Sequence, residues 1–296
     1  MDFRQMSGKI KGMKSGFVML AGRSNVGKST LLNALVGSKV AIMSPKPQTT
    51  RHPVRGVLHD ARGQIVFVDT PGLFLGKKDR VSKRLNELVN ESLEDIDAIV
   101  YVVDPTRAPG MEEEAIQKLL TTAKKPILYL VNKADLPTAK RPFLETYRAV
   151  DVGQEGSAEV SAKTRKNLNL VVDTLFELMP EGEPFYPDMQ MTDMSHNDWL
   201  AELIREKCFV ALHQELPYSI QVRIENQDTR PDGSRHIAAS ILTTEDRYKG
   251  MIIGKGAQKL KEIGMAARKE LETVLGSKIF LDLRVNVDPK WQQRFQ

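Results

Sequence analysis

The segment GRSNVGKST at residues 22–30 has the residue types and spacing of a phosphate-binding loop. It matches G-x-x-x-x-G-K-[ST], and it stands between an apolar run typical of a strand and the helical run LLNALV. Gly22 and Gly27 let the backbone curve until its N–H groups converge on phosphate oxygens. Lys28 would bring a cation to the β- and γ-phosphates, and the Ser29 hydroxyl would bind Mg²⁺. The pattern therefore predicts a nucleoside triphosphate site.

Two further segments indicate which base is bound. NKAD at 132–135 follows an apolar run, and its Asp135 can accept from the ring N–H and the exocyclic amine of guanine, a donor pair that adenine lacks. Asn132 and the stem of Lys133 would flank the base. SAK at 161–163 can offer backbone N–H groups to guanine O6. The two segments favour GTP over ATP, which argues against a kinase or a metabolic ATPase.

The segment DTPG at 69–72 would contact Mg²⁺ and the γ-phosphate through Asp69 and the Gly72 N–H. Between it and the phosphate loop lies SPKPQTTRH, 44–52, which is typical of a mobile switch segment. Thr50, or failing that Thr49, is the candidate for a hydroxyl that reaches Mg²⁺ only when GTP is bound. Loss of the γ-phosphate would release both segments.

Leu73 stands where Ras-type enzymes carry a glutamine that orients water, so slow intrinsic turnover is expected. Asn25 could instead help to hold a potassium ion beside the phosphates. We expect Lys28, Thr50, Asn25 and Gly72 to act in hydrolysis, and Ser29, Thr50 and Asp69 to bind the metal. The predicted GTP-binding residues are Gly22, Arg23, Ser24, Asn25, Val26, Gly27, Lys28, Ser29, Thr30, Asp69, Thr70, Pro71, Gly72, Leu73, Asn132, Lys133, Asp135, Ser161, Ala162 and Lys163.

The elements that must position these residues alternate between strand and helix from residue 16 to about 180. Continuous apolar runs lie at 17–20, 64–70, 98–104, 126–132 and 158–161, with helical stripes between them. This alternation predicts an α/β P-loop GTPase fold of the Ras-like kind, with a doubly wound, mostly parallel sheet.

The rest of the chain has a different pattern. Residues 181–190 hold two prolines and a glycine and read as a linker. A helix over 197–214, alternating strands at 218–224, 237–241 and 279–287, and a helix carrying 260–274 predict a small α+β domain with a sheet covered on one face. We therefore divide the chain into a tail (1–15), a GTPase domain (16–180), the linker and a second domain (191–296).

Composition sets limits on class and partner. The chain has 296 residues, one cysteine and a net charge of +5, so an internal disulfide framework and cysteine-built zinc sites are excluded. Cys208 falls on an apolar helical stripe and reads as a buried small hydrophobe. Residues 247–269 carry seven basic side chains and one acid, Glu262, which indicates an anionic partner.

The location of the protein is predicted from the same composition. No apolar run reaches the ~20 residues of a membrane span, and the N-terminus lacks a signal sequence, so a cytoplasmic monomer is expected. The N-terminal lysines could also touch anionic lipid at the inner face of the cell membrane, although a solvated tail is favoured.

Together these motifs resemble the Era GTPases of bacteria. QTTRH, LIREK, LPYS at 216–219 and IIGKGAQKLKEIGMAAR narrow the resemblance beyond the GTPase motifs, and it covers about Gly16 to Trp291. The resemblance implies a type II KH domain after the GTPase domain. It also implies binding of ribosomal RNA near the 3′ end of the small-subunit RNA, and a role in assembly of the 30S subunit.

The loop of that KH domain would be a GXXG-type turn, where backbone can approach a phosphodiester chain. Here the last glycine is replaced by Ala257, whose methyl could crowd a phosphate or oppose a positive φ. The predicted RNA-binding residues are Gly254, Lys255, Gly256, Ala257, Lys259 and Lys261. The alternative is a regulatory GTPase whose second domain binds a protein or a membrane surface. Local positive charge favours RNA.

Overall fold

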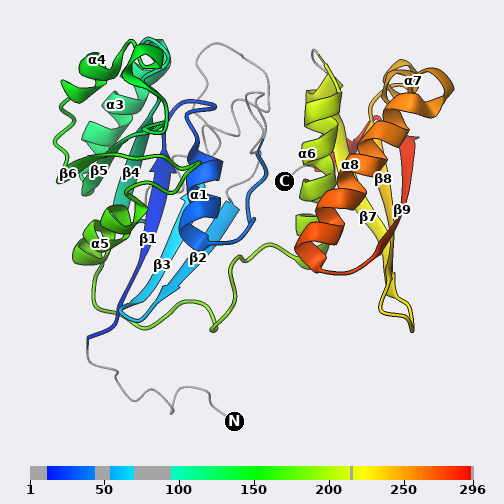
Figure 1. Cartoon of the computed structure of the whole chain (residues 1–296), viewed down its shortest axis with the longest axis horizontal. Helices are drawn as coiled ribbons and strands as arrows, with labels where there is room; N and C mark the ends of the chain where they lie inside the picture. The colour runs from blue at the N-terminus through cyan, green and yellow to red at the C-terminus, as the bar shows by residue number, and fades with distance from the viewer. Residues whose placement is uncertain (1–11, 44–53, 70–94, 214–215, 295–296) are drawn as a thin grey trace. The chain divides into compact units, whose positions relative to one another are not determined.

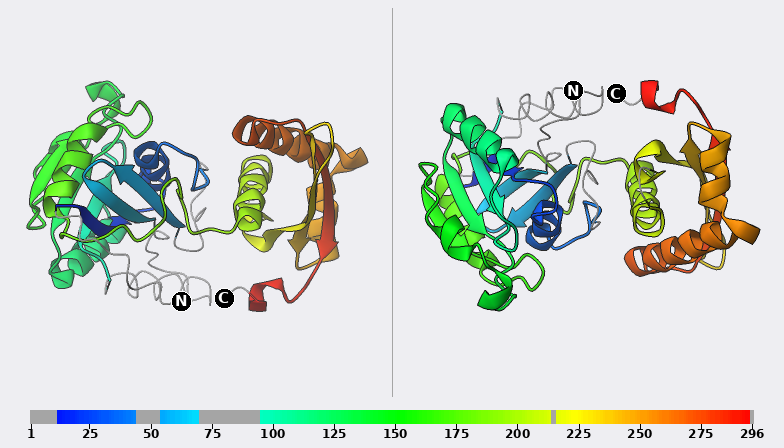
Figure 2. Two further views of the ribbon diagram at one scale, coloured as in Figure 1. Left: turned by 90° about the horizontal axis from the view of Figure 1, so that it is seen from below. Right: turned by 90° about the horizontal axis from the view of Figure 1, so that it is seen from above.

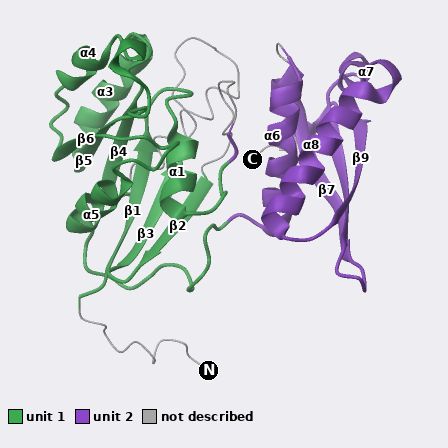
Figure 3. Cartoon of the chain, viewed as in Figure 1, with its two compact units in different colours: residues 1–41, 50–193 green, residues 42–49, 194–296 purple. Residues whose placement is uncertain are grey.

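The computed structural model describes residues 12–43, 54–69, 95–213 and 216–294. The chain forms two compact units, coloured separately in Figure 3. Unit 1 comprises residues 1–41 and 50–193, and unit 2 comprises residues 42–49 and 194–296. Each unit has its own sheet.

Unit 1 contains a six-stranded sheet in the order β2-β3-β1-β4-β5-β6 (Figure 1). Every neighbouring pair is parallel except β2 with β3, which is antiparallel. The strands are β1 (Lys14–Ala21), β2 (Val54–Asp60), β3 (Gly63–Asp69), β4 (Ala98–Val103), β5 (Ile127–Val131) and β6 (Gly156–Glu159). The helices are α1 (Lys28–Val36), α3 (Met111–Ala123), α4 (Leu144–Arg148) and α5 (Leu168–Leu178).

Helices cover both faces of this sheet, as its continuous apolar strands require. On one face, Met19, Ile99 and Tyr129 pack in a cluster with residues of α3 and α4. On the other, a Cβ built at Gly56 would meet Leu32 of α1, and one built at Gly156 would approach Thr174 of α5. The doubly wound, mostly parallel sheet predicted from the sequence is confirmed.

The segment predicted as a linker lies along the edge strand β2 of unit 1. The Gln64 side chain accepts from the backbone N–H groups of Phe185 and Tyr186, at 2.8 and 3.0 Å. Val57 N–H donates to the Met191 carbonyl, and Gly56 bridges to Thr192. The chain thus adds a short irregular strand to the sheet edge before unit 2 begins.

Unit 2 is an α+β domain with a three-stranded sheet in the order β7-β8-β9. β7 pairs antiparallel with β8, and β8 pairs parallel with β9. Its elements are α6 (His196–Ala211), β7 (Ile220–Thr229), β8 (Arg235–Thr243), α7 (Asp246–Ile253), α8 (Gln258–Leu275) and β9 (Ile279–Val287).

One face of that sheet carries the core of unit 2. Alternate strand residues such as Val222, Ile237 and Val285 pack with Ile204 of α6 and Ile263 of α8, and Figure 2 shows these helices on the same side of the sheet. The intervening residues of β7 and β9, Arg223 and Arg284 among them, are exposed. The expected sheet with one solvated face is therefore present.

Several elements differ from the sequence expectations. Strand β2 and helix α7 were not predicted, whereas α3 and α4 lie between apolar runs, where helices were expected. Strand β6 spans Gly156–Glu159 rather than 158–161. Beyond β6, Val160 still donates from its N–H to the Val131 carbonyl at 2.9 Å, and its own carbonyl accepts from the Ala134 N–H at 2.9 Å. Helix α6 ends at Ala211 rather than at 214, since Leu212 is already extended, with φ −90° and ψ 157°.

Two composition arguments can also be compared with the structure. Cys208 is fully buried in the core of unit 2, and burial raises the pKa of its thiol to about 12. The prediction of a buried, unreactive cysteine is confirmed. Among the helices in the described ranges, none combines the length and apolar character that a membrane span needs.

Candidate functional site

The loop between β1 and α1 has the curvature that phosphate binding needs. Three of its residues have positive φ: Gly22 (146°), Asn25 (63°) and Gly27 (107°). A Cβ at Gly22 would lie 2.4 Å from the Val102 carbonyl oxygen, and one at Gly27 would lie 2.3 Å from Asn132 Nδ2. Both glycines are therefore required by contacts as well as by conformation. Val26 is buried, Asn25 is exposed and Thr30 lies on α1.

Lys28 opens α1 and is buried beneath the loop. Its Nζ donates to the carbonyl oxygens of Gly22 and Arg23, at 2.8 and 2.9 Å. Burial lowers the pKa of Lys28, and the carboxylate of Asp69 opposes that change. The amine is thus held inside the loop, where phosphate oxygens would stabilise the positive charge that burial disfavours.

Ser29 and Asp69 come together from α1 and the end of β3. The Ser29 hydroxyl donates to Asp69 Oδ2 at 2.6 Å, and Asp69 is fully buried. A hydroxyl beside a carboxylate is a hard oxygen donor set, which suits Mg²⁺ held jointly by the protein and by phosphates. In the described residues no cluster of three or more His, Cys, Asp or Glu could hold a metal ion.

Asn132 of the NKAD segment contacts both the phosphate loop and the SAK segment. Its Nδ2 donates to the Val26 carbonyl at 2.8 Å, and its Oδ1 accepts from the Ala162 N–H at 3.0 Å. The side chain is buried. In the structure Asn132 ties the phosphate loop to the SAK turn, and its expected place beside the base stays a prediction.

The carboxylate of Asp135, predicted to read the base, is oriented by a serine of the neighbouring turn. Ser161 Oγ donates to Asp135 Oδ1 at 2.7 Å and accepts from the Thr164 N–H at 3.1 Å. Asp135 and Lys163 are exposed, and Lys133 has a left-handed φ of 64°. The two motifs, 26 residues apart along the chain, form one polar edge at the carboxyl ends of β5 and β6. Ligands bind at this end of such sheets.

The remaining predicted residues of this site lie outside the described residues. These are Thr49 and Thr50 of the switch segment, and Thr70, Pro71, Gly72 and Leu73 after β3.

Unit 2 carries a second glycine loop, between α7 and α8. Gly254, Gly256 and Ala257 all have positive φ, at 73°, 57° and 59°. A Cβ at Gly254 would lie 2.8 Å from the Lys259 Cβ, so only glycine fits there. Ala257 adopts the left-handed conformation that its methyl disfavours, at a cost of about 1–2 kcal/mol. The departure from glycine therefore does not alter the shape of the turn.

The charges around this loop are exposed. Lys255 and Lys261 are exposed, and Lys259 pairs with Glu262 at 2.9 Å. A groove of about 350 Å³ continues from Ala257 along α8 and β9. It is lined by Ala257, Leu260, Lys261, Gly264, Met265, Arg268, Leu281 and Leu283.

Most of the groove residues were not among the predicted RNA-binding residues. Leu281 and Leu283 lie in the strand predicted at 279–287 and pack, partly buried, against the core of unit 2. Met265 is exposed and Gly264 adds no side chain, so together they leave an open apolar strip beside the turn. The groove could have been predicted from Gly264 and Met265, a small and an apolar residue side by side on the helix that follows the glycine loop.

Comparison with known proteins gives matches over both units. Residues 17–133 match the family model described as 50S ribosome-binding GTPase, and residues 215–292 match the KH domain model. GTPase Era of Heliobacterium modesticaldum is 41% identical over 287 residues, covering 96% of this chain and 95% of its own. GTPase Era of Deinococcus deserti is 41% identical over 283 residues, with coverages of 94% and 92%.

Two solved structures are similar over both units. Era in complex with MgGDPNP and nucleotides 1506–1542 of 16S ribosomal RNA has a TM-score of 0.85 at 37% identity, covering 95% of this chain and 96% of that one. A single-residue variant of Aquifex aeolicus Era bound to GDP·AlF₄⁻ has a TM-score of 0.86 with the same identity and coverages. With a P-loop GTPase unit followed by a KH domain, and this identity over nearly its whole length, the chain belongs to the GTPase Era family.

Proposed function

We propose that this protein is a GTP-hydrolysing switch that binds small-subunit ribosomal RNA through unit 2 and acts in assembly of the 30S subunit. The observation that carries the RNA-binding part is the glycine loop of residues 254–257 with its groove. Residues of positive φ at 254, 256 and 257 lie next to exposed lysines and an apolar strip. Backbone approach, positive charge and an apolar floor are what a KH module offers to single-stranded RNA.

The nucleotide part of the proposal rests on the arrangement in unit 1. Lys28 and the loop N–H groups would bind the phosphates, and Asp135 would read guanine. Ser29 and Asp69 would hold Mg²⁺, an assignment supported by the MgGDPNP in the similar Era structure. The ion would neutralise phosphate charge. Lys28 would add its own charge beside it, and Asn132 would keep the phosphate and base segments in register.

In this proposal the role of GTP hydrolysis is to set when the RNA is released, not to make a metabolite. Thr50 and Gly72 would sense the γ-phosphate, and its loss would free both switch segments. The RNA would then be held or released according to the nucleotide bound. The subunit is inferred from the 16S RNA in the similar structure, whereas the GTPase family model is described by the 50S ribosome.

The experiment is a salt titration of RNA binding by the full chain. The probe is an RNA oligonucleotide corresponding to nucleotides 1506–1542 of 16S RNA, the segment in the similar structure. The double variant Lys255→Ala, Lys259→Ala should bind more weakly, and its log-log salt slope should flatten by about 0.7 for each phosphate contact removed.

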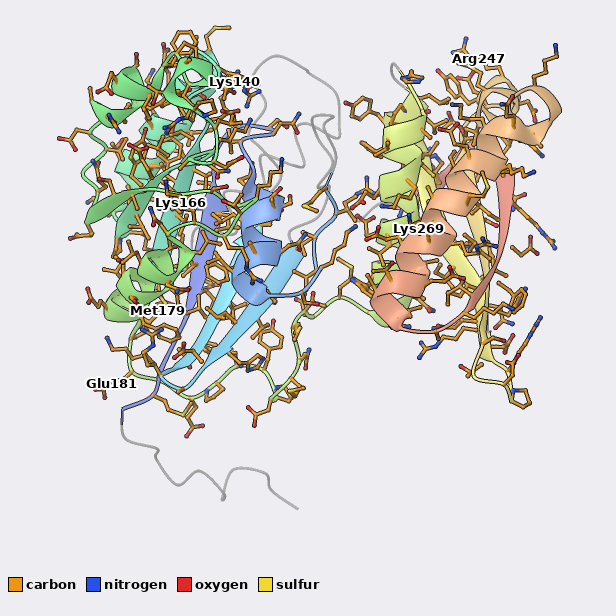
Figure 4. The ribbon with its side chains drawn as sticks, in the orientation of Figure 1. Lys140, Lys166, Met179, Glu181, Arg247 and Lys269 are labelled. Carbon is orange, nitrogen blue, oxygen red and sulfur yellow. The ribbon has the colours of Figure 1, made fainter. Side chains whose placement is uncertain are left out.

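A matched control is Lys269→Ala. Lys269 is exposed on the same helix, labelled in Figure 4, and lies roughly 16 Å along the axis from the first residue of α8. Its removal changes net charge without touching the loop, so affinity should change much less. Equal losses of affinity per lysine removed would mean that charge alone, not the loop, binds RNA. Binding that ignores all three lysines would instead support a protein or membrane partner.

Three narrower parts of the proposal accompany it. Potassium would stimulate hydrolysis through Asn25, which lies exposed in the phosphate loop. The protein would act as a monomer in the cytoplasm, where ribosomal subunits are assembled. A contact of the N-terminal tail with anionic lipid stays a prediction, and most of that tail lies outside the described residues.

A further inference from the structure

Asp104, the residue after β4, is a buried carboxylate that belongs to none of the predicted nucleotide motifs. It is 2% exposed, so its charge must be compensated inside the protein. Its Oδ1 accepts from the N–H and the hydroxyl of Thr106, at 3.0 and 2.7 Å. Its Oδ2 accepts from Lys133 Nζ and lies 3.4 Å from Arg107 Nε. The Asp104 carboxylate thus contacts the cations of Lys133 and Arg107 and also accepts hydrogen bonds from Thr106 in the turn after β4.

The protonation state of Asp104 suits this arrangement. Burial alone would raise its pKa, but hydrogen bonds from Lys133 and Thr106 outweigh burial and lower the pKa below its ordinary value. The group is therefore an anion at neutral pH, paired with Lys133 of the base-reading segment. That pairing restrains the side chain of Lys133, whose stem would flank guanine. The backbone of Lys133 is left-handed.

The turn that begins at Asp104 also contacts the phosphate loop. Arg107 Nη2 donates to the Ser24 carbonyl at 2.8 Å, and the Arg107 N–H donates to the Asp104 carbonyl. From the other side, Arg23 of the loop donates to the Ala108 carbonyl at 3.1 Å and pairs with Glu112 and Glu113 of α3. The segment 104–113 therefore contacts Arg23 and Ser24 of the phosphate loop. At the start of the same segment, Asp104 binds Lys133 of the NKAD segment.

We propose that Asp104 is a positioning residue that couples base binding to phosphate binding, through Lys133 on one side and through Arg107 and Ser24 on the other. This inference rests on the proposed guanine-nucleotide site. Asp104 does not touch the reacting atoms, so it sets nucleotide affinity rather than the rate of the bound complex.

The test uses the full-length protein with Asp104→Asn. Asparagine has the same shape and still accepts from Thr106, but its amide donors would face the Lys133 ammonium and Arg107. We expect the Kd for GDP to rise roughly ten- to a hundredfold. The rate at saturating GTP should stay within about twofold of the unchanged protein, because ground-state and transition-state binding are lost equally.

A second readout separates positioning from base reading. Inosine diphosphate lacks the exocyclic amine, so Asp135→Asn should change the ratio of GDP to IDP affinity. Asp104→Asn should weaken both nucleotides by the same factor, since Lys133 flanks either base. Thr106→Val is the matched control: it removes one hydrogen bond to Asp104 but leaves the Lys133 pair, and GDP affinity should fall less than about threefold.

Arg107→Met keeps the test valid if Asp104→Asn proves unstable, because Arg107 is 39% exposed and its removal leaves the core intact. Arg107→Met should weaken GDP binding, and its effect should shrink when it is combined with Asp104→Asn. Strictly additive effects, or normal GDP affinity in a folded Asp104→Asn protein, would overturn the coupling. Failure of the unchanged protein to bind GDP would instead overturn the proposed function itself.

Discussion

The two glycine loops of this protein use one backbone device in opposite surroundings. Both place residues of positive φ immediately before a helix, at Gly27 before α1 and at Ala257 before α8. The first loop closes over a buried amine and packs against Val102 and Asn132. The second presents exposed lysines, and a Cβ at Gly256 would meet nothing within 4 Å. The enclosed loop before α1 fits a compact ligand such as a nucleotide phosphate. The open loop before α8 fits an extended ligand that passes along the surface.

The largest expected effect is at the enclosed cation. Lys28→Ala should weaken GTP binding by about a thousandfold, since two or more charge-assisted hydrogen bonds of about 1.5–3 kcal/mol each would be lost. The fold should survive, because the hydrogen bonds of the Lys28 amine go to carbonyls of the loop itself. Equilibrium nucleotide binding and circular dichroism check both parts. A variant with normal GTP affinity would contradict the assignment of the loop.

A matched pair of glycine substitutions tests directly whether the two loops differ in enclosure. Gly27→Ala should lower the free energy of unfolding by about 2–4 kcal/mol, since its methyl would collide with Asn132 at a strained φ. Gly256→Ala should cost only about 1 kcal/mol, because its surroundings are empty and only the left-handed φ of 57° is penalised. Denaturant titration of both variants measures the difference. Equal costs would mean that the loops do not differ in enclosure.

At the base-reading edge, Asp135→Asn should weaken guanine nucleotides by about a hundredfold, because one charge-assisted hydrogen bond is lost and an amine is left without its acceptor. An amide can donate to the second carbonyl of xanthine, so preference should move towards XTP. Competition between GTP and XTP for the purified variant provides the measurement. Retained preference for GTP would exclude Asp135 from base reading.

Potassium should stimulate hydrolysis severalfold over sodium at matched ionic strength. Asn25 is exposed in the phosphate loop, where its side-chain oxygen could help to hold a monovalent cation beside the phosphates. Such a cation would partly replace the charge that an arginine finger supplies elsewhere. Turnover under saturating GTP is the quantity to compare, with Asn25→Ala as the control. Equal rates in the two salts would remove potassium from the mechanism.

The smallest effect is expected in the open loop. Ala257→Gly removes a left-handed strain of about 1–2 kcal/mol but adds about 0.5–1 kcal/mol of unfolded-chain entropy, so stability should rise by only about 0.5 kcal/mol. Ala257 also lines the groove, so RNA affinity reports whether its methyl crowds the strand. A loss of stability would show that the methyl packs favourably, and it would weaken the description of this loop as open.

Much of unit 1 was predictable because its signals are local. Glycine, lysine and serine at fixed spacing between a strand and a helix leave few alternatives, and continuous apolar runs indicate strands covered on both faces. The edge strand β2 was missed because it pairs antiparallel and its pattern, VRGVLHD, is weak. Its position became clear only once β3 and the 181–193 segment were placed on either side of it.

The class of each domain, the nucleotide and the turn expected to meet RNA could be predicted from residue types at short spacing. The contacts that join the motifs to one another are visible only in the folded chain. Asn132 ties the phosphate loop to Ala162, Ser161 orients Asp135, and Asp104 gathers Lys133 and Arg107. Apart from the Asp104–Arg107 pair, these contacts join residues 26 or more positions apart, and each could be formed by many polar side chains. Which residues meet depends on which strand ends lie next to each other in the sheet, and no local sequence pattern shows that.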